Sequence, residues 1–69
     1  MLDVTISLNG GPRSVPAGSS VTSLVEELGL DPARIAIEFE LNILPRGQWS
    51  TTTLTEGSRL EIVHFVGGG

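Results

Sequence analysis

The residues of this sequence with the clearest chemical possibility are its last three, Gly67, Gly68 and Gly69. Glycine has no Cβ, so a run of three is thin and flexible enough to enter a narrow channel in another protein. The reactive group of such a tail is the carboxylate of Gly69. Frayed chain ends are also often rich in glycine, and on composition alone that simpler interpretation is favoured.

A carboxylate is a poor acyl donor until a good leaving group is attached to it, which is the usual purpose of covalent activation. A glycine-rich phosphate loop would carry Lys and then Ser or Thr after its glycines, at the start of a helix. The run Val66-Gly67-Gly68-Gly69 has neither feature. The run therefore cannot bind the phosphates of ATP itself, so any activation of the carboxylate must come in trans, and we expect no cofactor bound to this chain.

The other side chains offer little chemistry. The sequence has no cysteine, which excludes a thiol nucleophile, a disulfide framework and a thiolate zinc site. A lone histidine, here His64, is a poor metal-ligand candidate, so we expect no metal site. Paired carboxylates need a pocket for acid–base work, and we instead interpret the glutamates as solubilising surface charges: Glu38, Glu40, Glu56 and Glu61.

Size and charge narrow the class of protein. A chain of 69 residues has room for one domain and a small core, so a self-contained enzyme cleft is not expected. The net charge of −4 argues against nucleic acid and membrane partners and favours a basic protein partner. There is no lysine, so self-linked chains are not expected. No signal segment is recognisable, and we expect a cytoplasmic protein.

The first part of the chain predicts a β-hairpin and a helix. Alternating apolar residues predict a strand over residues 2–8, and Asn9-Gly10-Gly11 predicts a tight turn into an edge strand over residues 12–16. Apolar residues then follow a helical stripe at Val21, Leu24, Val25 and Leu28. Ser20 is placed to cap the start of this helix, and Gly29 its end.

The second part predicts further strands. Asp31-Pro32 resembles a brief helical turn, and alternation at Ile35, Ile37 and Phe39 predicts a third strand. A turn at residues 40–42 and a short return at residues 43–44 follow. Residues 45–49 are read as an irregular or single-turn segment because Pro45 cannot continue a central strand. A last strand over residues 59–66 runs into the glycines.

This order predicts an α+β domain over residues 1–66, with one helix packed across a mixed sheet, and a flexible tail over residues 67–69. In the last strand the two-residue period places Leu60 and Ile62 in the core. Val63 and Phe65 then face outward, as a docking patch beside the tail or simply as exposed residues. Trp49 is expected to be a structural lid over the edge of the core.

Four segments of the sequence are informative when taken together: Ile37-Glu38-Phe39, Pro45-Arg46-Gly47-Gln48-Trp49, the run from Glu56 to Val63, and Phe65-Val66-Gly67-Gly68-Gly69. Together they resemble the sulfur carrier of thiamine biosynthesis, the ThiS family. The likeness covers essentially the whole chain, and it favours a functional reading of the tail. It implies the ubiquitin-like β-grasp fold, in which the first and last strands lie side by side and parallel.

The resemblance also implies a mechanism. An E1-like adenylating enzyme would join the Gly69 carboxylate to AMP, and sulfur from a desulfurase or sulfurtransferase would replace the adenylate. The resulting thiocarboxylate would donate its sulfur to thiazole synthase. Gly67 and Gly68 would thread into the partner, while Val63, Phe65, Val66 and Arg46 would contact it. The protein would be a co-substrate and not a catalyst.

Three alternatives stay open at this point. A sulfur carrier for molybdopterin synthesis would use the same tail. A ubiquitin-like modifier would pass the acyl group to a lysine amine. A passive β-grasp interaction module would not need the tail at all.

Overall fold

The structure is a computed structural model and describes residues 2–65 of the chain. The elements it contains are the strands β1 (Asp3–Leu8), β2 (Gly11–Pro16), β3 (Ile35–Phe39), β4 (Asn42–Ile43) and β5 (Arg59–His64), the helix α1 (Val21–Leu28), and the 3₁₀ turns η1 (Pro32–Arg34) and η2 (Arg46–Gln48).

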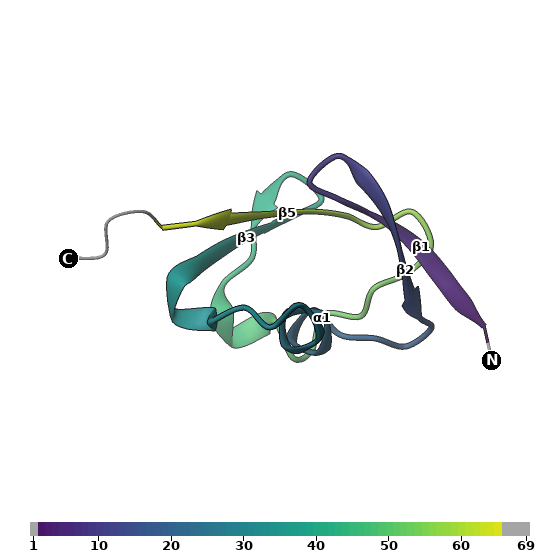
Figure 1. The fold of residues 1–69 in the computed structure, drawn as a ribbon, viewed down its shortest axis with the longest axis horizontal. Helices are drawn as coiled ribbons and strands as arrows, with labels where there is room; N and C mark the ends of the chain where they lie inside the picture. Colours follow the sequence, from purple (N-terminus) through teal and green to yellow (C-terminus); the bar gives the residue numbers. More distant parts are fainter. Residues whose placement is uncertain (1, 66–69) are drawn as a thin grey trace.

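The strands form a mixed five-stranded sheet in the order β2-β1-β5-β3-β4. β1 and β5 are parallel, with Ser7 opposite Arg59 and Leu8 opposite Leu60, while β5 and β3 are antiparallel. The helix α1 packs across one face of the sheet, and β5 continues past the end of β1 toward one end of the molecule (Figure 1). This confirms the predicted α+β arrangement and the parallel pairing of the first and last strands.

The first hairpin has a two-residue turn. Leu8 pairs with Gly11, and between them Asn9 and Gly10 have φ values of 51° and 83°. Two successive positive φ values match the twist of the strands, and Asn-Gly is the sequence that adopts them most readily. The turn is thus the one expected, and β2 begins one residue earlier than predicted.

The helix α1 has the bounds that its apolar stripe predicts, and both of its ends are capped. The Ser20 hydroxyl accepts a hydrogen bond from the Ser23 amide at 3.1 Å, and the Ser23 hydroxyl accepts one from the Ser20 amide at 2.9 Å. Gly29 ends the helix with a left-handed φ of 71°. These contacts satisfy main-chain groups that an isolated helix leaves unpaired.

The core lies between the sheet and α1. Side chains from all parts of the chain meet there, so no segment can bury its apolar face alone. The buried hydrophobic residues are Ile6, Val15, Val21, Leu24, Val25, Ile35, Ile37, Trp49, Leu54, Leu60 and Ile62.

The turn between β3 and β4 differs from its prediction. It is a two-residue turn at Glu40 and Leu41, with φ values of 51° and 72°, and β4 begins at Asn42. Neither residue is glycine, so the sequence carries no strong signal for this turn. Leu41 has a left-handed main chain that L-residues with large side chains rarely adopt, and its side chain is 69% exposed.

We expect Leu41→Gly to raise the free energy of unfolding by about 1 kcal/mol, because glycine adopts this φ without a clash between Cβ and the main chain. Chemical denaturation measures the change. Leu41→Ala is the matched control: it removes the same exposed side chain but keeps the Cβ, and it should leave stability within about 0.5 kcal/mol of the wild type. Equal stability of the two variants would contradict the assignment of strain.

Candidate functional site

The end of β5 is the part of the structure that leads into the glycines. Leu60 and Ile62 point into the core, with 0% and 8% of their surfaces exposed, whereas Val63 is 54% and Phe65 55% exposed. The predicted alternation of buried and exposed residues is confirmed. β5 therefore carries core residues on one face and exposed apolar residues on the other.

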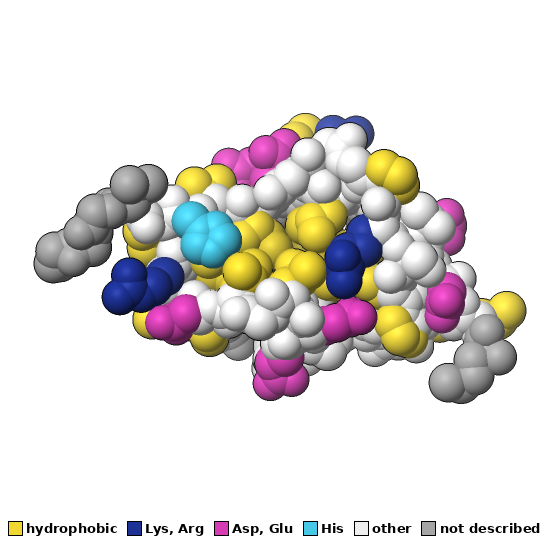
Figure 2. Space-filling model, in the orientation of Figure 1, with side chains coloured by type: hydrophobic (Ala, Val, Ile, Leu, Met, Phe, Trp, Pro, Cys, Tyr) yellow, Lys and Arg dark blue, Asp and Glu magenta, His cyan; other side chains and the backbone are white. Residues whose placement is uncertain are grey.

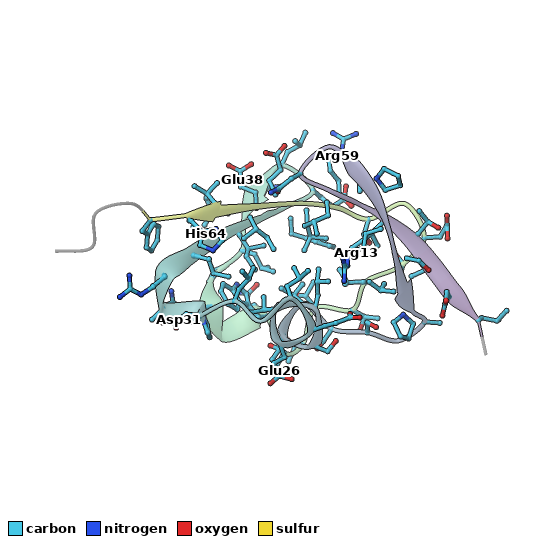
Figure 3. The ribbon with its side chains drawn as sticks, viewed as in Figure 1. Arg13, Glu26, Asp31, Glu38, Arg59 and His64 are labelled. Carbon is cyan, nitrogen blue, oxygen red and sulfur yellow. The ribbon has the colours of Figure 1, made fainter. Side chains whose placement is uncertain are left out.

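The exposed residues of β5 belong to a larger apolar face, defined here as Ala36, Ile43, Val63 and Phe65. Val63 lies opposite Ala36 on β3, and Ile43 on β4 lies opposite Glu38. This side of the sheet faces away from α1, as Figure 3 shows for Glu38. Ile43 is 68% exposed. The sequence analysis read Ile43 only as part of a returning strand, because its outward orientation depends on the register of β4.

A hollow of about 180 Å³ joins this apolar face to the segment after β4. Ala36, Ile43 and Phe65 line one part of it, and Leu44, Pro45 and Arg46 line another. A hollow lined mainly by apolar groups at the root of the tail is suited to receive an apolar side chain of a partner.

Arg46 has structural contacts at the rim of this hollow. Its guanidinium donates a hydrogen bond to the Pro32 carbonyl at 2.8 Å and lies 5.5 Å from the centre of the Trp49 ring. A weaker contact of 3.5 Å reaches the carbonyl of Ile35, at the β3 edge that the short β4 leaves uncovered. These contacts hold the segment after β4 against the sheet. A contact between Arg46 and a partner stays a prediction.

Trp49 closes the core beneath Arg46. Its side chain is 4% exposed, and its Nε1 donates a hydrogen bond to the Leu44 carbonyl at 3.0 Å. A buried indole needs such an acceptor for its N–H group. The prediction that Trp49 is a structural lid is confirmed.

Two of the glutamates do more than the sequence analysis assigned to them. Glu56 Oε1 accepts a hydrogen bond from the Thr5 amide, and Glu40 Oε2 accepts one from the Arg59 amide, each at 2.9 Å. Describing them as solubilising charges was incomplete, because each also satisfies a strand N–H group. Both residues lie in turns, far along the chain from the strand residues they contact, so no local pattern reveals these bonds.

The remaining predicted site residues lie outside the described residues. They are Val66, Gly67, Gly68 and Gly69. Their assigned roles stay predictions. Within residues 2–65, no cluster of acidic residues and histidine has the arrangement of a metal site. No helix in that range has the length and apolar character needed to cross a bilayer.

The family model for ThiS matches residues 6–69, which is nearly the whole chain. The chain belongs to the ThiS family. Solved structures agree with this membership. A crystal structure of the thiamine biosynthesis protein ThiS from Geobacter metallireducens is 28% identical, with a TM-score of 0.82 over 96% of this chain and 100% of that one. A solution structure of a thiamine biosynthesis protein from the same organism gives 29% and 0.75, over 96% and 88%.

Curated relatives add a different kind of likeness. Thiazole synthase from Paramagnetospirillum magneticum is 39% identical over 62 residues, and thiazole synthase from Magnetococcus marinus is 38% identical over 64 residues. These matches cover 90% and 93% of this chain but only 19% and 20% of the relatives, so the chain spans about a fifth of their length. An uncharacterised protein, ycf40, from Porphyra purpurea is 31% identical over 97% of this chain and 94% of its own length.

We expect Arg46→Ala to lower the free energy of unfolding by about 1 kcal/mol, because it removes a charged hydrogen bond and the contact with the Trp49 ring. Chemical denaturation followed by tryptophan fluorescence measures the loss. Arg34→Ala is the control, since Arg34 is an exposed arginine in a surface ion pair with Asp31 and should matter little. Equal effects of the two substitutions would show that Arg46 is not structural.

Proposed function

We propose that this chain carries sulfur for thiamine biosynthesis, as a thiocarboxylate formed on Gly69. The observation that supports this most strongly is the match to the ThiS family over residues 6–69, which extends through the glycines. The solved structures of thiamine biosynthesis proteins, which share its fold at TM-scores of 0.82 and 0.75, support the same role.

The proposed chemistry occurs at a carboxylate that is activated elsewhere. A Gly69 carboxylate oxygen attacks the α-phosphorus of ATP, pyrophosphate leaves, and the acyl-adenylate forms. The outer sulfur of a persulfide on the donor protein then attacks the acyl carbon, and AMP leaves. A thiol next attacks the donor's sulfur in the resulting acyl disulfide, so that the S–S bond breaks, a new disulfide forms on the donor, and the thiocarboxylate remains on Gly69. The first step attaches a good leaving group, AMP, to the acyl carbon, and the attack by sulfur then displaces that group. The chain itself is a carrier and a co-substrate, not an enzyme.

The proposed chemistry requires three kinds of partner protein: one that uses ATP, one that donates sulfur and one that accepts it. The sequence lacks the Lys and Ser or Thr of a phosphate loop, so we assign ATP to an E1-like adenylating enzyme and the sulfur to a desulfurase or sulfurtransferase. Thiazole synthase is the proposed acceptor. Support for it comes from the two thiazole synthases that contain a segment similar to this chain. Because activation consumes ATP, we place these reactions in the cytoplasm.

We assign the apolar face as the surface that these partners bind. It lies beside the end of β5, so an enzyme bound to it is also close to the point where the tail begins. The net charge of −4 favours partners with a basic surface around an apolar centre. Val63, Phe65, Val66 and Arg46 remain the proposed contact residues, and the geometry adds Ile43.

Incubation of the chain with ATP, a sulfur source and cell extract should convert Gly69 to the thiocarboxylate. Intact-mass spectrometry should show the replacement of one oxygen by sulfur. A variant lacking Gly68 and Gly69 is the control and should show no replacement. If the full chain kept its mass while a known sulfur carrier in the same extract was converted, the proposal would be wrong.

We expect Val63→Asp to weaken capture of the adenylating enzyme and of thiazole synthase by about tenfold, because it places an unpaired charge in a buried apolar contact. Quantitative pull-down measures the capture. Leu2→Asp is the matched control: Leu2 is 82% exposed, and it precedes β1 at the other end of the molecule from the end of β5 (Figure 1). Recovery of a molybdopterin synthase large subunit in place of thiazole synthase would assign the carrier to that pathway.

A further inference from the structure

β5, the strand that leads to the tail, has no paired strand on its β1 side over its last residues. β1 pairs with β5 only at Ser7 opposite Arg59 and Leu8 opposite Leu60, and after Leu8 the chain turns away into β2. β5 continues past this point to His64. On that side Figure 2 shows hydrophobic side chains at the surface between His64 and the arginine that Figure 3 labels Arg13. Nothing among the described residues forms a strand along this edge.

Hydrogen bonds to β3 identify which groups of β5 face this open edge. The Glu40 amide donates to the Arg59 carbonyl, and the Phe65 amide donates to the Arg34 carbonyl, so Arg59 and Phe65 bond toward β3. Because strand residues alternate in the direction of their N–H and C=O groups, those of Leu60 and Ile62 point the other way: Leu60 faces the end of β1, and Ile62 faces the open edge beyond it.

Asn9 occupies this edge where β1 has ended. Its main-chain N–H donates to the Leu60 carbonyl at 2.9 Å. Its side-chain Oδ1 accepts a hydrogen bond from the Ile62 amide at 2.7 Å, and its Nδ2 donates to the Ile62 carbonyl at 3.3 Å. A side-chain amide has the same donor and acceptor as a peptide group. Asn9 therefore acts as one more residue of β1.

The position accepts few other residues. Asn9 has φ 51°, a left-handed main chain that asparagine, aspartate and glycine adopt more readily than other residues. Aspartate would set a second oxygen against the Ile62 carbonyl, and glycine would have no side chain to offer. Asparagine alone of the three provides both the turn and the two hydrogen bonds.

We propose that Asn9 is a positioning residue for the tail. It fixes β5 at Ile62, so that the chain stays extended through Phe65 and the direction of the chain at Phe65 is fixed. Acyl activation requires the reacting oxygen and phosphorus to meet in a narrow geometry, so a fixed direction raises the fraction of productive encounters. This inference rests on the proposed function, in which the Gly69 carboxylate is the reacting group.

The test compares Asn9→Gly and Asn9→Asp with Ser20→Ala, which removes the cap of α1 and destabilises the fold away from β5. Amide hydrogen exchange of Phe65 is the first measurement. The Phe65 amide bonds to Arg34 and not to Asn9, so it reports the order of the strand. We expect roughly tenfold faster exchange in both Asn9 variants than in Ser20→Ala. Asn9→Gly loses both side-chain hydrogen bonds to Ile62, whereas Asn9→Asp loses the one to the Ile62 carbonyl and sets a second oxygen against it.

The second measurement is ATP–pyrophosphate exchange with the E1-like adenylating enzyme encoded in the same genome. Both Asn9 variants should show a kcat/KM about tenfold below that of Ser20→Ala. Unchanged Phe65 exchange would overturn the proposal, and so would faster exchange with a kcat/KM equal to that of Ser20→Ala. If the wild-type chain supported no pyrophosphate exchange at all, the proposed function would fail, whatever the Phe65 data showed.

Discussion

The two-residue period of β5 is the constraint on which the rest of the structure depends. One strand must pair with β1 and β3, fill the centre of the core with Leu60 and Ile62, and also hold Val63 and Phe65 outside it. A shift of the register by one residue would exchange these two sets and would place apolar core residues in water. The fold and the candidate docking surface are thus set by the same hydrogen bonds.

Side chains complete this pairing at three places where a strand ends early. The Asn9 side chain accepts a hydrogen bond from the Ile62 amide beyond the end of β1. Glu40 accepts one from the Arg59 amide, and Glu56 accepts one from the Thr5 amide. Main-chain N–H groups that are left without a partner are costly when water is excluded from them. The strands of this domain are short, and these polar side chains extend the hydrogen bonding of the sheet beyond the strand ends without additional strand residues.

The sequence predicts those features that depend on neighbouring residues. The Asn9-Gly10 turn, the helix with its Ser20 cap, and the alternation along β5 all follow from local patterns. The turn at Glu40 and Leu41 does not, because neither residue signals a left-handed main chain. The tail chemistry came from the resemblance to a family, and the residues that would perform it lie beyond the described structure.

The contacts of Asn9 and Glu56 were missed for a different reason. Each joins groups that are far apart along the chain: 53 residues separate Asn9 from Ile62, and 51 separate Glu56 from Thr5. No spacing rule links such residues, since their meeting depends on the finished sheet. The outward direction of Ile43 likewise follows only from the register of the two-residue strand β4.

The parallel contact between β1 and β5 also has a consequence for folding. It closes a loop that contains almost the whole chain, and long-range pairings of this kind are slow to form because their entropic cost comes before their reward. The apolar face, in contrast, is built from β3, β4 and the end of β5, whose antiparallel pairings join segments that are closer in the sequence. It can therefore form before β1 has paired with β5, and a partner that recognises this face alone would not distinguish a finished domain from one whose longest loop is still open.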